Sequence, residues 1–183
     1  GTSAGVSSLI IAGPTTTELG LEWSDVKRRG NRDRLDDEEL EIGRFHLDHN
    51  WAISQNQKLR VQYDHDREES NYQGSPYSYD TRRDELRLSH EVAFGAAGQH
   101  RLDTLLRYSN EDGDWARDEF EFLPRLSLTH SDKLKTVYRY NLYRFQQDAI
   151  DITQHKFDVE ALYRPVSYTH LRAHETPEHL VCR

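Results

Sequence analysis

The residues of this chain that are most able to do chemistry are carboxylates that stand two positions apart. Glu119 and Glu121 would project from the same face of a β-strand, because side chains alternate between the two faces. Two neighbouring carboxylates are the catalytic apparatus of most glycoside hydrolases. The same spacing arises far more often where a strand face is simply covered by water, and no nucleophile elbow accompanies the pair. We therefore predict no catalytic residue and no enzymatic activity.

The histidines and the acidic turn of the chain offer no convincing metal or cofactor site. His46 and His49 would lie on opposite faces of a strand, so they cannot chelate one ion together. The run 112–114, Asp-Gly-Asp, resembles part of a calcium loop but lacks the spacing and the terminal Glu of an EF-hand. A glycine-rich phosphate loop is also absent from the sequence. We predict neither a metal nor a cofactor.

The composition excludes several classes of protein. The chain has 183 residues, enough for one domain, and a net charge of -8. Its basic run Lys27–Arg34 is followed at once by the acidic run Asp36–Glu39, so we predict no nucleic-acid partner. The mean hydropathy is -0.93 and no apolar run approaches the roughly 18–20 residues of a transmembrane helix. A membrane β-barrel is not excluded, because its strands alternate and average to a polar composition.

Two consecutive segments, Asp84–Phe94 and His100–Ser109, predict a β-hairpin. In both segments apolar residues occupy every second position and charged residues occupy many of the positions between. The turn that joins them, Gly95–Gln99, is short and contains two glycines. Two strands with one apolar and one polar face are therefore expected here.

The same alternation recurs along the chain and predicts nine strands. Besides the hairpin, we expect strands at Val6–Ala12, Glu18–Asp25, Leu40–Trp51, Lys58–Asp66, Phe120–Leu128, Leu134–Phe145 and Phe157–Tyr163. A change of phase at Gly43 suggests a β-bulge, and Pro124 predicts irregular pairing of its strand. The predicted fold class is all-β: an antiparallel up-and-down meander of about nine amphipathic strands.

The predicted connections alternate in length. Short connections are expected at 13–16, 52–57, 95–99 and 130–133. Longer polar connections are expected at 24–37, 67–83, 110–117 and 146–154. One end of the sheet would thus carry tight turns and the opposite end longer loops.

Over residues 1–165 these features resemble bacterial outer-membrane β-barrels of the porin-like kind, with short periplasmic turns and longer extracellular loops. The resemblance implies that the nine strands are part of a larger transmembrane β-barrel in the bacterial outer membrane. Apolar side chains would face the membrane lipid and polar ones a lumen. The implied function is a passive channel for small solutes or a structural scaffold, with a plug or partner protein left open.

The resemblance also implies roles for particular residues. The residues expected to line the lumen are Arg60, Asp64, Glu85, Arg87, Glu91, Asp103 and Arg107. Those expected to form an interfacial aromatic girdle are Trp23, Trp51, Tyr63, Tyr108, Tyr138 and Tyr140.

His90 is the residue that fits the lipid-facing assignment least well. It occupies the apolar face in the middle of its strand, where a charge would cost roughly 2–4 kcal/mol, so the ring would have to be neutral. The alternative is a soluble, secreted or periplasmic antiparallel β-sheet protein that binds a glycan or a protein partner. In such a protein the apolar face would pack on itself and the same charged residues would face bulk solvent.

The last segment, residues 166–183, does not continue the strand pattern. It resembles a translated sequencing-library adapter, and we expect it to be a non-native tail. The competing interpretation is a metal-binding tail, since His170 and His174 have the spacing of ligands on a helix. The sequence has no Met and no signal-peptide start before Gly1, so we expect residues 1–165 to be a partial barrel domain, truncated at both ends.

Overall fold

In the computed structural model, the described residues form one antiparallel sheet of nine strands in chain order. The structure describes residues 1–28, 38–72, 78–114 and 116–164. The strands are β1 (Thr2–Ala12), β2 (Thr15–Arg28), β3 (Glu38–Ser54), β4 (Gln57–Tyr72), β5 (Tyr79–Phe94), β6 (His100–Gly113), β7 (Arg117–Thr129), β8 (Leu134–Gln147) and β9 (Ile150–Tyr163). The predicted adapter-like segment 166–183 lies outside the described residues.

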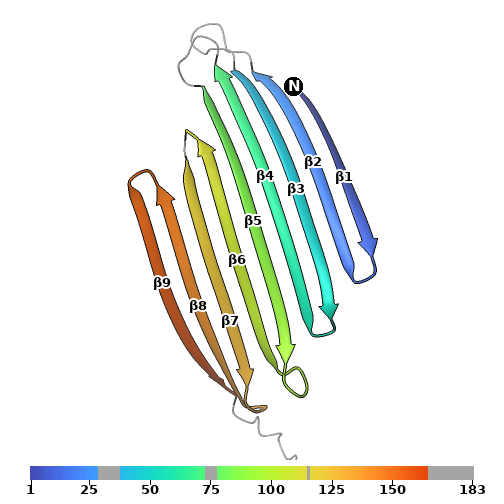
Figure 1. Cartoon of the computed structure of the whole chain (residues 1–183), viewed down its shortest axis with the longest axis vertical. Coiled ribbons are helices and arrows are strands. Elements are labelled where there is room, and N and C mark those ends of the chain that lie inside the picture. Colours follow the sequence, from blue (N-terminus) through green and yellow to red (C-terminus); the bar gives the residue numbers. More distant parts are fainter. Residues whose placement is uncertain (29–37, 73–77, 115, 165–183) are drawn as a thin grey trace, which may run out of the picture.

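The nine strands form an up-and-down meander, in which each strand pairs with the strand before it and the strand after it (Figure 1). All eight pairings are antiparallel, from β1–β2 to β8–β9. The prediction of an all-β meander of about nine strands is therefore confirmed. In the described ranges no helix is long and apolar enough to cross a membrane.

The tight turns lie at one end of the sheet, and several depend on glycine. Gly13, between β1 and β2, has a φ of 58°, and Gly95, between β5 and β6, has a φ of 91°. Both values lie in the region that favours glycine, because a Cβ atom is crowded there. In Figure 1 these turns step progressively along the strand direction from β1–β2 to β7–β8, so the strands are staggered.

The predicted long connections are shorter in the structure, and one prediction is wrong. The segment 146–154, expected as a loop, is almost entirely strand, and only Asp148 and Ala149 separate β8 from β9. Likewise β4 extends to Tyr72 and β6 to Gly113. The extensions of β4 and β6 carry polar residues on both faces, so they lack the alternation that reveals a strand, although their backbone groups still pair across strands. In β9 the alternation is present, since Ile150 and Ile152 alternate with Asp151 and Thr153, and the prediction overlooked it.

Two local predictions have different outcomes. The bulge expected at Gly43 is wrong, because the β3–β4 register runs unbroken from Glu38 to Ala52 and shifts only between Ala52 and Ser54. The irregularity expected at Pro124 is confirmed. The β7–β8 pairs continue in the same register on both sides of Pro124, but the pairs of Leu123 and Pro124 are missing. Proline has no backbone N–H to donate to a ladder.

Candidate functional site

The two faces of the sheet differ sharply in chemistry, and the strand register defines them. One hydrogen-bonded row, starting at Asp48 on β3, contains Gln62, Arg87, Arg107 and Glu121. We call the side of the sheet that carries this row the polar face. The next row contains Leu47, Tyr63, Leu86, Tyr108 and Phe120, and its side chains point to the opposite side, the apolar face.

All seven residues predicted to line a lumen lie on the polar face, and each contacts a group of opposite charge or the His46 ring. The contacts, with distances between heavy atoms, are Arg60 Nη2 to Asp48 Oδ2 (2.5 Å), Asp64 Oδ1 to His46 Nδ1 (2.5 Å), Glu85 Oε2 to Arg83 Nη2 (2.7 Å), Arg87 to Glu85, Glu91 Oε2 to Arg101 Nη2 (3.2 Å), Asp103 Oδ1 to Arg101 Nε (2.5 Å) and Arg107 Nη2 to Glu119 Oε2 (3.2 Å). These contacts link side chains along and across the strands from β3 to β7. The polar face therefore carries several clusters of ion pairs and hydrogen bonds.

The carboxylate pair that first suggested hydrolase chemistry belongs to one of these clusters. Glu119 and Glu121 flank the guanidinium of Arg107, whose Nη2 and Nε atoms lie 3.2 Å and 3.7 Å from their carboxylate oxygens. Arg117 also approaches Glu119, at 3.9 Å. Both carboxylates therefore take part in ion pairs with arginines of the polar face.

Burial on the sheet is inverted relative to a water-soluble protein. Six described residues are buried, and five of them are polar or charged: Asp48, Ser70, Glu85, Ser109 and Ser127, with Val137 as the sixth. All six lie on the polar face. The apolar face instead carries most of the exposed large hydrophobic side chains, with Phe157 and Val6 about two thirds exposed (65% and 66%). In soluble proteins the large apolar residues are the ones that are buried.

The six residues predicted as an aromatic girdle all lie on the apolar face. Trp23 and Trp51 are 47% and 42% exposed, and they stand on β2 and β3 at opposite ends of the apolar stretch. The hydroxyl of Tyr63 donates to Asp84 (2.5 Å) and that of Tyr108 to Asp118 (3.0 Å). The remaining two, Tyr138 and Tyr140, lie nearer the middle of the apolar stretch of β8, and the Tyr140 hydroxyl lies 2.7 Å from His155 Nδ1. Their arrangement as a girdle stays a prediction.

His90 has a polar partner on the apolar face. The amide nitrogen of Gln57 lies 2.8 Å from His90 Nε2, on the same face. The two polar side chains therefore satisfy each other on a face whose other side chains are mostly apolar.

The apolar stretches form a band that crosses the hydrogen-bonded rows obliquely. The row that contains Leu21 and Phe45, inside the band, passes through Asp84 and Asp118 and ends at Asp151 on β9. The band is therefore displaced toward the tight turns as the chain proceeds from β2 to β9. Such a displacement is expected when staggered strands are tilted relative to a barrel axis.

Beyond this band, at the end opposite the tight turns, the outward side chains become charged. Residues of this kind are Lys27, Glu39, Arg67, Asp80 and Arg82. The ammonium of Lys27 forms an ion pair and a hydrogen bond with Glu39, which raise the pKa of Lys27 above its ordinary value. The outward surface of these strands thus has an apolar zone and a charged zone.

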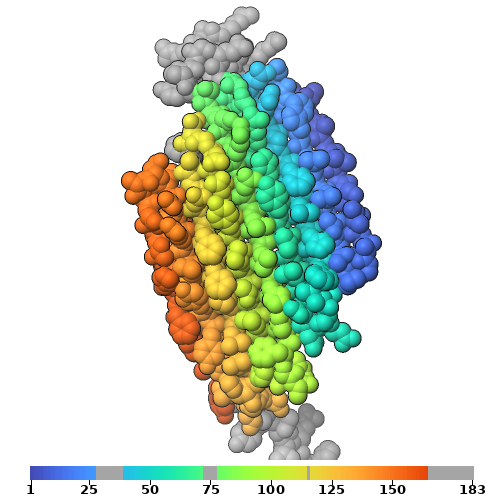
Figure 2. Space-filling model, viewed as in Figure 1, coloured from blue at the N-terminus to red at the C-terminus, as the bar shows by residue number. Residues whose placement is uncertain are grey.

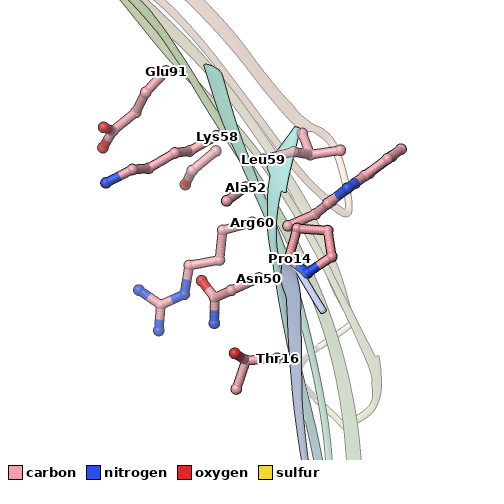
Figure 3. A pocket seen from close by; sticks show the side chains of 10 residues that line it. Pro14, Thr16, Asn50, Ala52, Lys58, Leu59, Arg60 and Glu91 are labelled. Atoms are coloured by element: carbon pink, nitrogen blue, oxygen red, sulfur yellow. The ribbon is translucent and has the colours of Figure 1, made fainter. Parts of the chain in front are cut away.

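A hollow of about 480 Å³ at the tight-turn end of β3 and β4 shows the separation of faces at close range. Figure 3 shows Lys58, Arg60 and Glu91 extending to one side of the sheet and Leu59 to the other. In the space-filling view, side chains of β1 to β9 form the visible face of the sheet (Figure 2). All nine described strands belong to this one sheet, so no other described element covers either of its faces.

Sequence reasoning missed several charged residues of the polar face. Asp48, Arg101 and Glu119 contact the predicted residues, and Arg125 and Arg139 lie beside them. Their positions in the alternating pattern already placed them on the same face, and this signal could have identified them. Their partners could not be identified in this way, because partners depend on the register between strands.

Comparison with known proteins supports the fold. No family model and no curated protein matches the sequence. The loop L8 deletion mutant of OmpT, an outer membrane protein of Vibrio cholerae, matches with a TM-score of 0.54 at 12% identity, over 88% of this chain and 53% of that one. Two structures of in-vitro folded OmpT, one of them in trimer form, match with TM-scores of 0.52 and 0.51 at 10% and 9% identity, over 88% of this chain and 55% of each.

These comparisons establish the architecture and leave the activity undecided. The chain spans about half the length of the solved structures it matches. At 9–12% identity the likeness shows the fold alone, that of part of an outer-membrane β-barrel. The prediction that the chain has no enzymatic activity is corrected by this likeness to OmpT. At this level of identity the likeness does not establish an enzymatic activity either.

Proposed function

We propose that the chain forms part of the wall of a barrel in the bacterial outer membrane, with its polar face toward a water-filled lumen and its apolar face toward lipid. The barrel would act as a passive channel for small solutes. The observation that carries the proposal is the inverted burial of the sheet, in which Asp48 and Glu85 are buried and Trp23, Trp51 and Phe157 are exposed.

The energetics of the apolar face favour a lipid surround. Removing one large apolar side chain from water contributes about 1.5–3 kcal/mol. The apolar face exposes a dozen such side chains: Val6, Ile10, Leu21, Trp23, Trp51, Leu86, Phe94, Tyr108, Leu134, Phe157, Val159 and Tyr163. A sheet with this face in water would lack that stabilisation on most of its strands. In a membrane, lipid would cover these side chains on every strand and remove them from water.

The dimensions of the apolar band also suit a membrane. On β8 it runs from Leu134 to Leu142, which is about 30 Å of strand at about 3.3 Å per residue. A tilt of about 45° reduces this to a height of about 20 Å, close to the roughly 25 Å of the apolar band of outer-membrane barrels.

The charges of the polar face would set the selectivity of the lumen. Most are paired with opposite charges, so the wall presents dipoles and small charged clusters rather than a surface of one sign. On β4, the carboxylates of Asp64, Asp66 and Glu68 follow one another toward the end away from the tight turns. Arg44 and Arg83 stand opposite Asp66 on the two neighbouring strands, so a solute entering from that end would meet mixed charge, and we expect little preference between cations and anions there.

The test uses the full-length protein in which these strands occur. After refolding into lipid vesicles, the channel predicts stepwise conductance in planar bilayers and release of small entrapped solutes. A protein that inserts but does not conduct would instead be a plugged or structural scaffold. A protein that stays soluble and monomeric without detergent would refute the membrane assignment and favour a secreted β-sheet protein.

A further inference from the structure

A second hollow on the polar face, about 450 Å³ in volume, lies over β5 to β8 near the tight-turn end. Its lining includes Asp103, Leu105, Leu123, Arg125 and Arg139. Leu105 and Leu123 are register partners, so two adjacent strands present an apolar pair on a face that is mostly polar. The hollow therefore combines an apolar patch with cationic side chains.

Arg125 is the cation of this hollow that is free to bind. Three lysines and arginines on the described part of the polar face have no carboxylate within 4.0 Å, namely Lys58, Arg125 and Lys135. Arg125 is exposed, and none of the described residues forms a hydrogen bond with it. Its two register partners are Asp103, whose carboxylate is occupied by Arg101, and Arg139, which pairs with Glu160 at 2.6 Å.

Arg125 stands opposite a like charge on one of its two neighbouring strands. Like charges directly opposite each other on neighbouring strands are destabilising, and Arg125 stands opposite Arg139. The ladder beside it is also interrupted at Leu123 and Pro124. The carboxylates of Asp103 and Glu160 are held by Arg101 and Arg139, so an anion on the Arg125 guanidinium would accept charge-assisted hydrogen bonds that no described residue takes up.

We propose that this hollow binds small organic monocarboxylates that carry an apolar body, with the carboxylate on Arg125 and the body against Leu105 and Leu123. The proposal rests on the proposed function, because the polar face must be accessible from a lumen. It adds a solute class to that function. An aromatic or short aliphatic acid that diffuses along the lumen would bind transiently at this site, near the tight turns.

Three probes separate the contributions of charge and apolar surface. Fluorobenzoate has both features, fluoroacetate has the charge without the apolar body, and fluorobenzyl alcohol has the body without the charge. Binding to the full-length protein in lipid nanodiscs is followed by fluorine NMR line broadening at low salt. We expect fluorobenzoate to bind and the other two probes to bind at least several-fold more weakly.

Two variants and a control test the assigned residues. Arg125→Ala removes one charge-assisted hydrogen bond and should weaken fluorobenzoate binding about tenfold. Leu123→Asn should reduce the preference for fluorobenzoate over fluoroacetate. The control is Arg44→Ala, on the same face but outside this hollow, where the arginine is already paired with Glu22 and Asp66. This variant should bind fluorobenzoate like the parent protein.

The outcomes distinguish this site from the channel itself. Equal losses in the Arg125 and Arg44 variants would overturn the site, since binding would then follow the general charge of the wall. Fluoroacetate bound as well as fluorobenzoate would overturn the apolar part of the proposal. Conductance is measured separately. If the protein conducts but its affinity for fluorobenzoate is unchanged by the Arg125 substitution, only the site is refuted. A protein that binds fluorobenzoate through Arg125 but does not conduct refutes only the channel.

Discussion

The sharpest test of the lipid-facing assignment compares two adjacent leucines on β6. Leu106 lies on the apolar face, between Leu88 and Phe122, near the middle of the band. Leu105 is its neighbour in the chain but lies on the polar face, opposite Leu123. The substitutions Leu106→Lys and Leu105→Lys introduce the same charge, at the same height, from the same starting residue.

The expected cost differs because the two side chains meet different surroundings. A lysine at the lipid-facing midplane costs about 2–4 kcal/mol, whereas one in a wet lumen is solvated. The folding equilibrium of Leu106→Lys should therefore fall by about 30- to 1,000-fold relative to the parent protein. The change for Leu105→Lys should be much smaller, because the lumen hydrates the ammonium.

The assay is reversible urea unfolding of the full-length protein in lipid vesicles, followed by tryptophan fluorescence. The reasoning would be refuted if Leu105→Lys cost as much as Leu106→Lys, or more. Equal, small costs of about 0.5 kcal/mol or less would indicate a sheet with water on both faces, because exposed surface substitutions have effects of that size.

Two further predictions concern the polar face and a turn. Asp48→Asn removes the carboxylate that pairs with Arg60, on a side chain that is only 9% exposed, and should lower the free energy of unfolding by about 1–3 kcal/mol. The control, Glu22→Gln, removes a carboxylate from an exposed pair and should change the free energy of unfolding by less than about 0.5 kcal/mol. A similar loss in both urea titrations would contradict the importance of the buried pair. Gly95→Ala places a Cβ at a φ of 91° and 2.8 Å from the Gln99 side chain, so it should destabilise the fold by about 1 kcal/mol, whereas Gly20→Ala meets only His46 Cβ at 3.7 Å. If thermal unfolding ranks these two glycine variants in the opposite order, the turn assignment is wrong.

The alternating pattern was sufficient to predict the strands inside the apolar band and failed outside it. Leu86, Leu88 and Val92 contrast with the charged residues between them, so the pattern located β5 and its faces correctly. In the extensions of β4 and β6 both faces are polar, and the sequence alone does not distinguish such a strand from a loop. The bulge predicted at Gly43 was wrong for a related reason. Leu40 and Ile42 are apolar residues that lie on the polar face beyond the band, so the change of phase after them reflects a change in residue type, and the register stays unbroken.

The sequence by itself determined the two faces of the sheet, because side chains alternate strictly along a strand and the residue types are fixed. It therefore predicted that Arg60, Glu85 and Arg107 share a side. The nature of the tail 166–183 stays a prediction. The tertiary structure alone decided which residues meet, since partners depend on the register between strands that are far apart in the chain. That register sets Arg107 between Glu119 and Glu121. It also places Arg125 opposite Asp103, whose carboxylate contacts Arg101, so Arg125 forms no ion pair with the described residues.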